Sequence, residues 1–230
     1  MLLVRTGAIE GYEKLVSQLG QNPAQILRKA GFSPAQLHQP NTYVSYAKLA
    51  TLLDSSAMLC NEPLFGLRLA AEQNLMVVGE LALSTTRQPS IAAALAYYDE
   101  HAHLHARGVS LQQHARGELA EASLSFDFTN NSGLLQLKQL SVCHLFNGLR
   151  VMVENSGQQL RYHLRQSRPV HAQWQWAIPA GQVQFDSHLD GVSFPASWLG
   201  RSPRGLETLV TEHLEQRIQF LELRYPNDLK

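Results

Sequence analysis

Four histidines are the residues of this sequence best placed to do chemistry: His101, His103 and His105 lie within five positions, and His114 follows. On a helix, His101 and His105 would share one face, a spacing that can hold zinc when a third ligand converges. No acidic residue stands between them, where a metalloprotease helix carries its general base. A titratable surface cluster at a helix end explains the same residues, and we prefer it. A metal-binding sensor or a metal-dependent enzyme that uses the cluster is the alternative.

Two further groups could line a pocket. His144 stands on an apolar stripe of a predicted helix beside Gly148, a glycine that could make room for something small. A histidine so placed is more often hydrogen-bonded in the core than a ligand. Trp174 and Trp176 alternate with glutamines, which predicts an extended segment with both indoles on one side. Indoles so arranged line ligand pockets and also fill ordinary cores, and we favour the core.

Standard catalytic motifs are missing from the sequence. It has no Gly-x-Ser-x-Gly elbow, no phosphate-binding glycine-rich loop, no dinucleotide fingerprint and no Cys-x-x-Cys. Catalytic residues can be scattered, so this does not exclude an enzyme, but it favours a binding protein. We therefore predict no catalytic residues, no bound metal and no cofactor.

The composition indicates an ordinary soluble protein with a real core, at 44% hydrophobic and 17% charged residues over 230 positions. Lys and Arg balance Asp and Glu at 19 each, so the chain as a whole has no electrostatic reason to bind DNA or an anionic membrane. Cys60 and Cys143 lack metal or disulfide spacing and are expected as buried free thiols. Neither a secretory signal nor a membrane span can be recognised, and we expect a cytoplasmic location.

The first half of the chain reads as helices. Residues 7–60 break into short helices at turn signals such as Gly20, Asn22-Pro23 and Ser33-Pro34, and the strongest apolar stripe runs over residues 45–60. A further helix lies between Phe65 and Gly79. Ser90 then starts a helix that we expect to continue to about residue 105.

The second half changes period. Residues 109–115 and 118–128 alternate as two strands of an antiparallel hairpin. Residues 134–154 return to helical spacing with apolar positions on two sides, which predicts a sandwiched helix. Short strands at residues 160–165, 183–185 and 192–194 should join the hairpin's sheet, and an amphipathic helix closes the chain over residues 206–221. The pattern predicts an α+β fold: a helical N-terminal half, a small antiparallel sheet, a long buried helix and a C-terminal amphipathic helix.

Several segments together resemble the N-terminal regulatory domain of AraC-type bacterial transcription regulators, in the subgroup with an arabinose-binding-like N-terminal region. They are FGLRLA at residues 65–70, Gly79 with Leu81, PSIAAAL at residues 89–95, Val183-x-Phe185, and Gly191-x-x-Phe194 followed by Leu199. The likeness covers nearly the whole chain. It departs from the family at Ala82, where members often have a second glycine after the leucine.

The resemblance implies a single regulatory domain over residues 1–230 that binds a small-molecule effector. Family members continue into paired helix-turn-helix units that enter the major groove of DNA, so we expect this chain to be a fragment without its DNA-binding domain. The effector would bind between the helices and the sheet and change how two protomers present their DNA-binding units. A dimerisation module without an effector is a further possibility.

Candidate residues follow from polar or aromatic character within apolar segments. The predicted effector-binding residues are Arg68, Tyr97, His144, Arg150, Trp174 and Trp176. The predicted homodimer contact is the apolar stripe of the last helix: Leu206, Leu209, Val210, Leu214, Ile218 and Leu221. This stripe could equally pack on its own domain, and both interpretations stay open.

Overall fold

A β-hairpin forms one edge of the larger sheet in this computed structural model, which describes residues 2–33, 36, 42–170 and 173–224. Strand β3 (Val109–Arg116) pairs antiparallel with β4 (Leu119–Phe126), with Val109 opposite Phe126 and Arg116 opposite Leu119. Gly117 makes the turn at a φ of 62°, a left-handed value that glycine adopts without strain. The predicted hairpin is confirmed.

The other predicted strands join the same sheet, in the order β3-β4-β7-β5-β6. Strand β7 (Gly191–Pro195) pairs antiparallel with β4 and with β5 (Arg161–His163). Strand β6 (Val183–Gln184) instead runs parallel to β5. The sheet is therefore mixed, not wholly antiparallel as predicted, because residues 164–182 are long enough to cross over and bring the chain back in the same direction.

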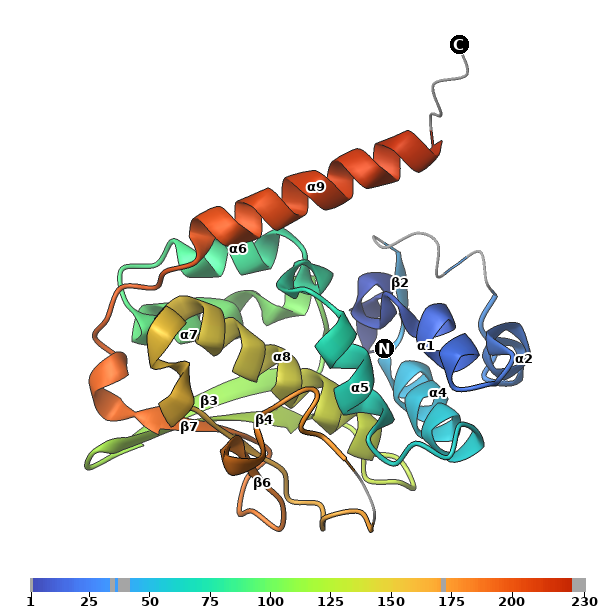
Figure 1. Ribbon diagram of the computed structural model, residues 1–230, viewed down its shortest axis with the longest axis horizontal. Helices are drawn as coiled ribbons and strands as arrows, with labels where there is room; N and C mark the ends of the chain where they lie inside the picture. Colours follow the sequence, from blue (N-terminus) through green and yellow to red (C-terminus); the bar gives the residue numbers. More distant parts are fainter. Residues whose placement is uncertain (1, 34–35, 37–41, 171–172, 225–230) are drawn as a thin grey trace.

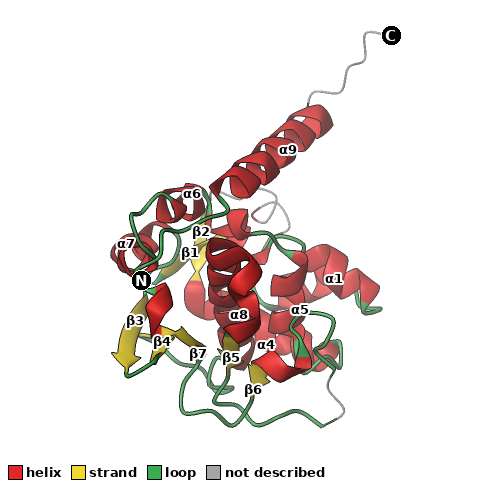
Figure 2. Ribbon diagram, turned by 60° about the vertical axis from the view of Figure 1, so that its left-hand side comes forward, coloured by secondary structure: helices red, strands yellow, loops and turns green. Residues whose placement is uncertain are grey.

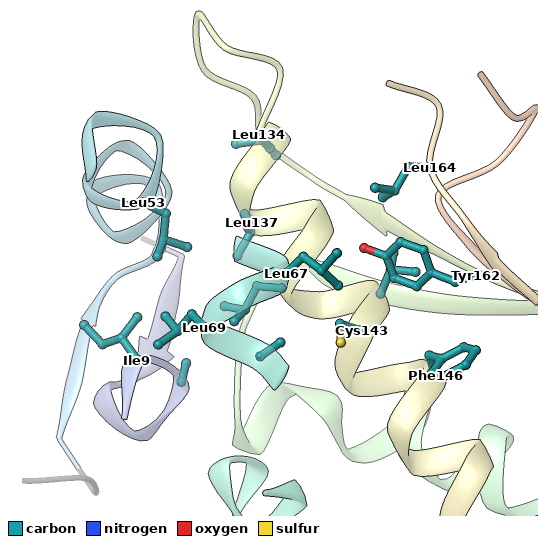
Figure 3. Close-up of a cluster of buried hydrophobic side chains, with 14 of the residues drawn as sticks. Ile9, Leu53, Leu67, Leu69, Leu134, Leu137, Cys143, Phe146, Tyr162 and Leu164 are labelled. Carbon is teal, nitrogen blue, oxygen red and sulfur yellow. The ribbon is translucent and has the colours of Figure 1, made fainter. Parts of the chain in front are cut away.

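Helix α8 (Leu135–Val153) lies between this sheet and helix α5 (Phe65–Glu72), as Figure 3 shows. On its sheet side the Tyr162 hydroxyl donates a hydrogen bond to the Gln139 carbonyl oxygen, 3.1 Å away. On its other side α5 brings the buried Leu67 against it. The predicted sandwiched helix is confirmed.

Short helices make up the N-terminal part, and their caps follow the sequence signals. The Asn22 side chain accepts from the Gln25 amide at the start of α2, and Ser45 accepts from Lys48 at the start of α4. The helix expected at Ser33-Pro34 falls partly outside the described residues. The elements here are β1 (Leu3–Arg5), η1 (Thr6–Ile9), α1 (Tyr12–Gln18), α2 (Pro23–Lys29), β2 (Tyr43–Ser45) and α4 (Tyr46–Leu59), with β1 and β2 forming a small antiparallel sheet that was not predicted.

Helix α7 (Ile91–His101) begins where predicted, because the Ser90 hydroxyl accepts from the Ala93 amide. It ends earlier than predicted: the chain continues as the 3₁₀ turn η3 (Ala102–Leu104). A 3₁₀ turn has three residues per turn, so it rotates the residues after His101 away from the α-helical face. Between α5 and α7 lie η2 (Leu75–Val78) and α6 (Glu80–Thr86).

The last helix, α9 (Leu206–Arg224), covers the predicted helix at residues 206–221 and ends three residues later. It follows the short turns η4 (Glu154–Gln159), η5 (Ala180–Gln182) and η6 (Ala196–Trp198) and contacts α6 and η2. From there it projects beyond the rest of the described chain (Figures 1 and 2). Among the described residues, no helix is long and apolar enough to cross a membrane. The fold is α+β, as predicted.

Candidate functional site

A partly open cavity of about 90 Å³ lies between α8 and the hairpin β3–β4, with further walls from α4, η2, α6, α7 and α9. Most of its lining is aliphatic. The apolar lining residues are Leu75, Val78, Ala82, Leu95, Ala106, Val109, Leu111, Leu124, Leu145, Gly148, Leu149, Met152 and Leu209. Its polar lining residues are Tyr46, Thr85, Thr86, Tyr98, His105, Ser141 and His144. The cavity is therefore an apolar space with a few polar groups at its wall, the general character of a small-molecule site.

Gly148 opens the α8 side of this cavity. A Cβ atom on Gly148 would lie 4.0 Å from Cδ2 of Leu75, an ordinary van der Waals contact. A glycine in the interior of a helix costs about 1 kcal/mol relative to alanine. Because no described atom crowds this position, close packing does not require the glycine, and its missing side chain leaves room in the cavity.

His105 is the unusual polar group of the lining. Its side chain is buried, at 8% exposure, and its Nδ1 has no hydrogen-bond partner in the described part of the chain. The backbone holds it in place, since Arg5 donates to its carbonyl oxygen at 2.9 Å and its own amide donates to Ala102. Burial, aided by the like charges of His144 and Arg5, lowers the pKa of His105 to about 3. The imidazole is therefore neutral, and one of its nitrogens is left unsatisfied.

His144 is anchored from outside the cavity. Its Nε2 lies 2.7 Å from Oε1 of Gln73, whose amide nitrogen donates to the carbonyl oxygens of Ala8 and Glu10. Because the Gln73 oxygen can only accept, the network assigns the proton to Nε2 of His144. Burial lowers the pKa of His144 to about 4, so this ring is neutral as well. The expectation of a hydrogen-bonded core histidine is confirmed.

The remaining polar groups of the lining are mostly satisfied within the protein. Thr85 donates to the Leu81 carbonyl oxygen at 2.7 Å, and Thr86 donates to that of Leu83 at 2.9 Å. Burial raises the pKa of Tyr98 to about 12. The pKa of Tyr46 is also raised by burial, against the opposing effect of its hydrogen bond to Ser141. None of the described lining residues is an Asp, Glu, Lys or Arg, so this part of the lining carries no formal charge at neutral pH.

Of the predicted effector-binding residues, His144 lines the cavity and the other five do not. Arg68 forms an ion pair with Glu62 at 2.9 Å, and its guanidinium lies 5.5 Å from the ring centre of Trp176. Trp174 is buried, whereas Trp176 is 47% exposed. The expected extended segment with both indoles on one side is wrong, because residues 175–177 form a turn that sends the indoles to different environments.

Tyr97 and Arg150 also lie away from the cavity lining. Tyr97 stacks on His101 with ring centres 4.1 Å apart, and Arg150 is exposed at the end of α8. These assignments as effector-binding residues stay predictions.

The histidine cluster does not form as a unit. His101 Nδ1 lies 2.9 Å from the Tyr97 carbonyl oxygen and His103 Nδ1 lies 3.0 Å from that of Glu100, while His114 is exposed on β3. His105 is buried, so its assignment to a surface cluster is wrong; the reason is the turn η3, which breaks the expected helix before residue 105. In the part of the chain that the structure describes, no three His, Cys, Asp or Glu side chains gather where they could hold a metal ion. Cys60 and Cys143 are buried free thiols, as expected.

The predicted dimerisation stripe divides along α9. Leu209 is 1% exposed and belongs to the cavity, whereas Leu214 and Ile218 are each 55% exposed. Leu221 is 38% exposed and Val210 is partly buried. The side chain of Leu206 lies outside the described part of the structure. The helix therefore packs on its own domain at its start and presents apolar side chains further along.

Sequence reasoning missed most of this site. Its lining comes from elements spread over residues 46–209, and the one sequence signal that pointed to it was the pair His144 and Gly148. In the sequence, His105 is indistinguishable from the other histidines of the cluster. No local signal indicates where an α-helix will end in a 3₁₀ turn.

Comparisons with known proteins point in one direction. A sequence model of the family described as the arabinose-binding domain of AraC transcription regulators, N-terminal, matches residues 20–202. Similar proteins include the HTH-type transcriptional regulator VirS of Mycobacterium tuberculosis, in strains CDC 1551 / Oshkosh and ATCC 25618 / H37Rv. Each is 29% identical over 109 residues, which is 47% of this chain and 32% of the relative. The matched region thus spans about a third of the length of these relatives.

Proposed function

This chain belongs to the family of arabinose-binding N-terminal domains of AraC transcription regulators, and we propose that it senses a small-molecule effector in the cavity between α8 and the hairpin β3–β4. The whole regulator would control transcription, with no chemistry done by this domain. The family match over residues 20–202 contains every element of the cavity except α9. The single observation that carries the proposal is this mainly apolar cavity, whose lining includes His105, a buried histidine with an unsatisfied Nδ1.

Helix α9 is the element through which occupancy of the cavity would be transmitted. Leu209, in its first turns, forms part of the cavity wall. The Arg204 amide donates to the carbonyl oxygen of Met152, a second lining residue, at 3.0 Å. A ligand that contacts Leu209 and Met152 therefore touches both sides of the junction between α8 and α9. Such a ligand shifts α9 between two arrangements only if it binds one of them more tightly.

DNA would be contacted by another part of the regulator. The relatives are named HTH-type transcriptional regulators, and a helix-turn-helix places its second helix in the major groove. We propose that such units follow α9 in the whole protein, so that a movement of α9 alters how they are presented to DNA. The balanced charge of residues 1–230 agrees with DNA contacts that lie outside this domain.

Two protomers would associate through the projecting part of α9. Leu214, Ile218 and Leu221 are exposed at spacings of four and three residues, which places them along one side of the helix. Sedimentation equilibrium tests this step: a dimer that Leu214→Lys converts to a monomer supports it. A wild-type chain that stays monomeric at high concentration removes dimerisation through α9.

A thermal-shift screen of amino acids, sugars, fatty acids and small aromatic compounds tests the sensing role. An effector at 100 times its dissociation constant stabilises the folded state by about 2.7 kcal/mol. The matched control is Gly148→Leu, whose side chain occupies the cavity from α8 without replacing a packed residue. A hit that raises the wild-type melting temperature and leaves that of Gly148→Leu unchanged supports the proposal. A screen without such a hit argues for a dimerisation module that senses nothing.

A further inference from the structure

We infer that the effector is a small, uncharged, mainly apolar molecule with one hydrogen-bonding group, of the class of phenols and small aromatic alcohols. This inference rests on the proposed function, because it names the chemistry of the molecule that would occupy the cavity. It differs from what the family description prints, which is a sugar. Size, charge and hydrogen-bonding capacity of the cavity support it independently.

The size and the walls of the cavity favour a single apolar ring. Its volume of about 90 Å³ is of the same order as the ~150 Å³ apolar cavities that stay dry and bind benzene or xenon. Aliphatic side chains face it from opposite sides: Leu111 and Leu124 from the hairpin, and Leu145 and Leu149 from α8. An apolar ligand that enters this space leaves water and gains contacts with these side chains.

The charge of the lining excludes an ionised ligand. The two titratable rings at the wall, His105 and His144, both have pKa values lowered by burial, to about 3 and about 4. Both are neutral at pH 7, and among the side chains that the structure describes no acidic or basic one lines the cavity. Burying an isolated carboxylate or ammonium group without a partner is far more costly than burying a neutral polar group. A carboxylate or an amine would therefore bind much more weakly than a neutral molecule of the same shape.

The small number of polar groups in the lining disfavours a sugar. The hydroxyl hydrogens of Thr85 and Thr86 are already donated to backbone carbonyl oxygens, so these groups can only accept from a ligand, and Nε2 of His144 is bonded to Gln73. A pentose carries a hydroxyl on nearly every carbon, and each one buried without a partner costs about 1–3 kcal/mol. His105 lines the cavity, and its buried Nδ1 has no hydrogen-bond partner among the described residues, so a ligand hydroxyl that reaches this ring can satisfy it. A ligand group that forms a hydrogen bond with Nδ1 also removes the free-energy cost of leaving this buried nitrogen without a partner.

Titration calorimetry of residues 1–230 with four named probes tests the inference: phenol, toluene, benzoate and arabinose. The wild type should bind phenol, with benzoate and arabinose at least about 100-fold weaker. Gly148→Leu should lose both phenol and toluene. His105→Phe should lower the ratio of phenol affinity to toluene affinity by about 5-fold or more, since only phenol can use the imidazole. His105→Asn, which keeps a polar atom near the position of Nδ1, should retain part of that preference.

The outcomes separate this inference from the proposed function. Benzoate or arabinose binding more tightly than phenol, and lost in Gly148→Leu, would overturn the effector class while leaving the cavity as the sensing site. An unchanged phenol-to-toluene ratio in a folded His105→Phe would remove the role of His105. If phenol and toluene do not bind the wild type, the effector class is wrong; if no compound of the wider screen depends on Gly148 either, the proposed function fails with it.

Discussion

The two ends of α8 are packed in opposite ways. Near its N-terminus, the Gly66 and Leu67 amides of α5 donate to the side-chain oxygens of Gln136 and Gln139, at 2.8 and 3.3 Å. The helices are so close there that a Cβ on Gly66 would lie 2.0 Å from the Gln136 carbonyl oxygen. Near its C-terminus, a Cβ on Gly148 would meet only Leu75, at 4.0 Å, across the cavity. One glycine allows contact between two helices, and the other leaves a space.

This difference separates the part of α8 that holds the fold from the part that is available to a ligand. Protein interiors are close-packed, and an empty cavity loses contact energy that a filled one would gain. The dense end fixes α8 between α5 and the sheet. The hollow end, next to α9, lacks packing contacts that a bound effector would supply. Departures from the best packing are expected at functional sites.

Two buried histidines on opposite faces of the sheet repeat the contrast. Tyr162 points toward α8, so the next residue of β5, His163, points to the other face. His163 lies 2.7 Å from the Ser193 hydroxyl and 3.0 Å from that of Ser187, so both of its ring nitrogens are satisfied. His105 faces the cavity with one nitrogen unsatisfied. A buried nitrogen without a hydrogen-bond partner occurs at His105 Nδ1 and at Trp174 Nε1 in the described chain, and of these two residues only His105 lines the cavity.

The largest expected effect comes from the dense end. Gly66→Ala forces a methyl group against the backbone of α8 at Gln136, and α5 and α8 would have to move apart. We expect a loss of about 4 kcal/mol or more in the free energy of unfolding, measured by urea titration. A variant as stable as the wild type would show that the two helices are not packed as described.

The second-largest expected effect is a decrease in the free energy of unfolding at acidic pH, caused by the two neutral histidines of the cavity. Their folded-state pKa values, about 3 for His105 and about 4 for His144, lie below the ordinary value of 6.5. The unfolded chain therefore binds more protons between pH 6.5 and these values, so stability is full above pH 6.5 and falls as the pH is lowered. Each histidine should cost about 2 kcal/mol between pH 7 and pH 5.

Urea unfolding at pH 7, 6 and 5 measures this slope, and His105→Phe is the matched variant. Because the variant removes one titrating ring, the dependence of its free energy of unfolding on pH should correspond to about one proton fewer. Because it also removes one unsatisfied nitrogen, its free energy of unfolding at pH 7 should not decrease. An unchanged slope would mean that His105 is already protonated or solvated in the folded protein.

The smallest effect belongs to the hollow end. Gly148→Ala replaces a helix-interior glycine where there is room for a methyl group, and it should raise the free energy of unfolding by up to about 1 kcal/mol. Urea titration of this variant and of Gly66→Ala under the same conditions makes the comparison direct. The same substitution should change the free energy of unfolding with opposite signs at the two ends of α8. Destabilisation by Gly148→Ala would mean that this end is packed as tightly as the other.

Local signals predicted most of the elements and little of the site. Asn22, Ser45 and Ser90 cap the helices that they were expected to start, and the alternation over residues 109–128 gave the hairpin. These features depend on neighbours in the sequence. Strands β1 and β2 were not predicted because three residues are too few to show a periodic pattern. Each strand is held by pairing with the other.

The cavity depends on contacts between distant segments. His144 and Gly148 were visible as a pair on one helix, but His105, Leu111 and Leu209 meet them only through the fold. The aromatic candidates Trp174 and Trp176 were chosen for residue type alone, and type does not tell a buried indole from an exposed one. Sequence periodicity states which face of an element is apolar, not whether the space beyond it is filled.

Methyl chemical-shift mapping tests the account most directly. The wild type, labelled at its leucine, valine and methionine methyl groups, is titrated with the effector that gives the largest thermal shift. We expect the largest methyl chemical-shift changes at Leu145, Met152 and Leu209, around the hollow end of α8 and the start of α9. The changes at Leu67, at the dense end, should be small. Changes centred instead near the segment of Trp174 and Trp176, with Leu209 unaffected, would contradict it.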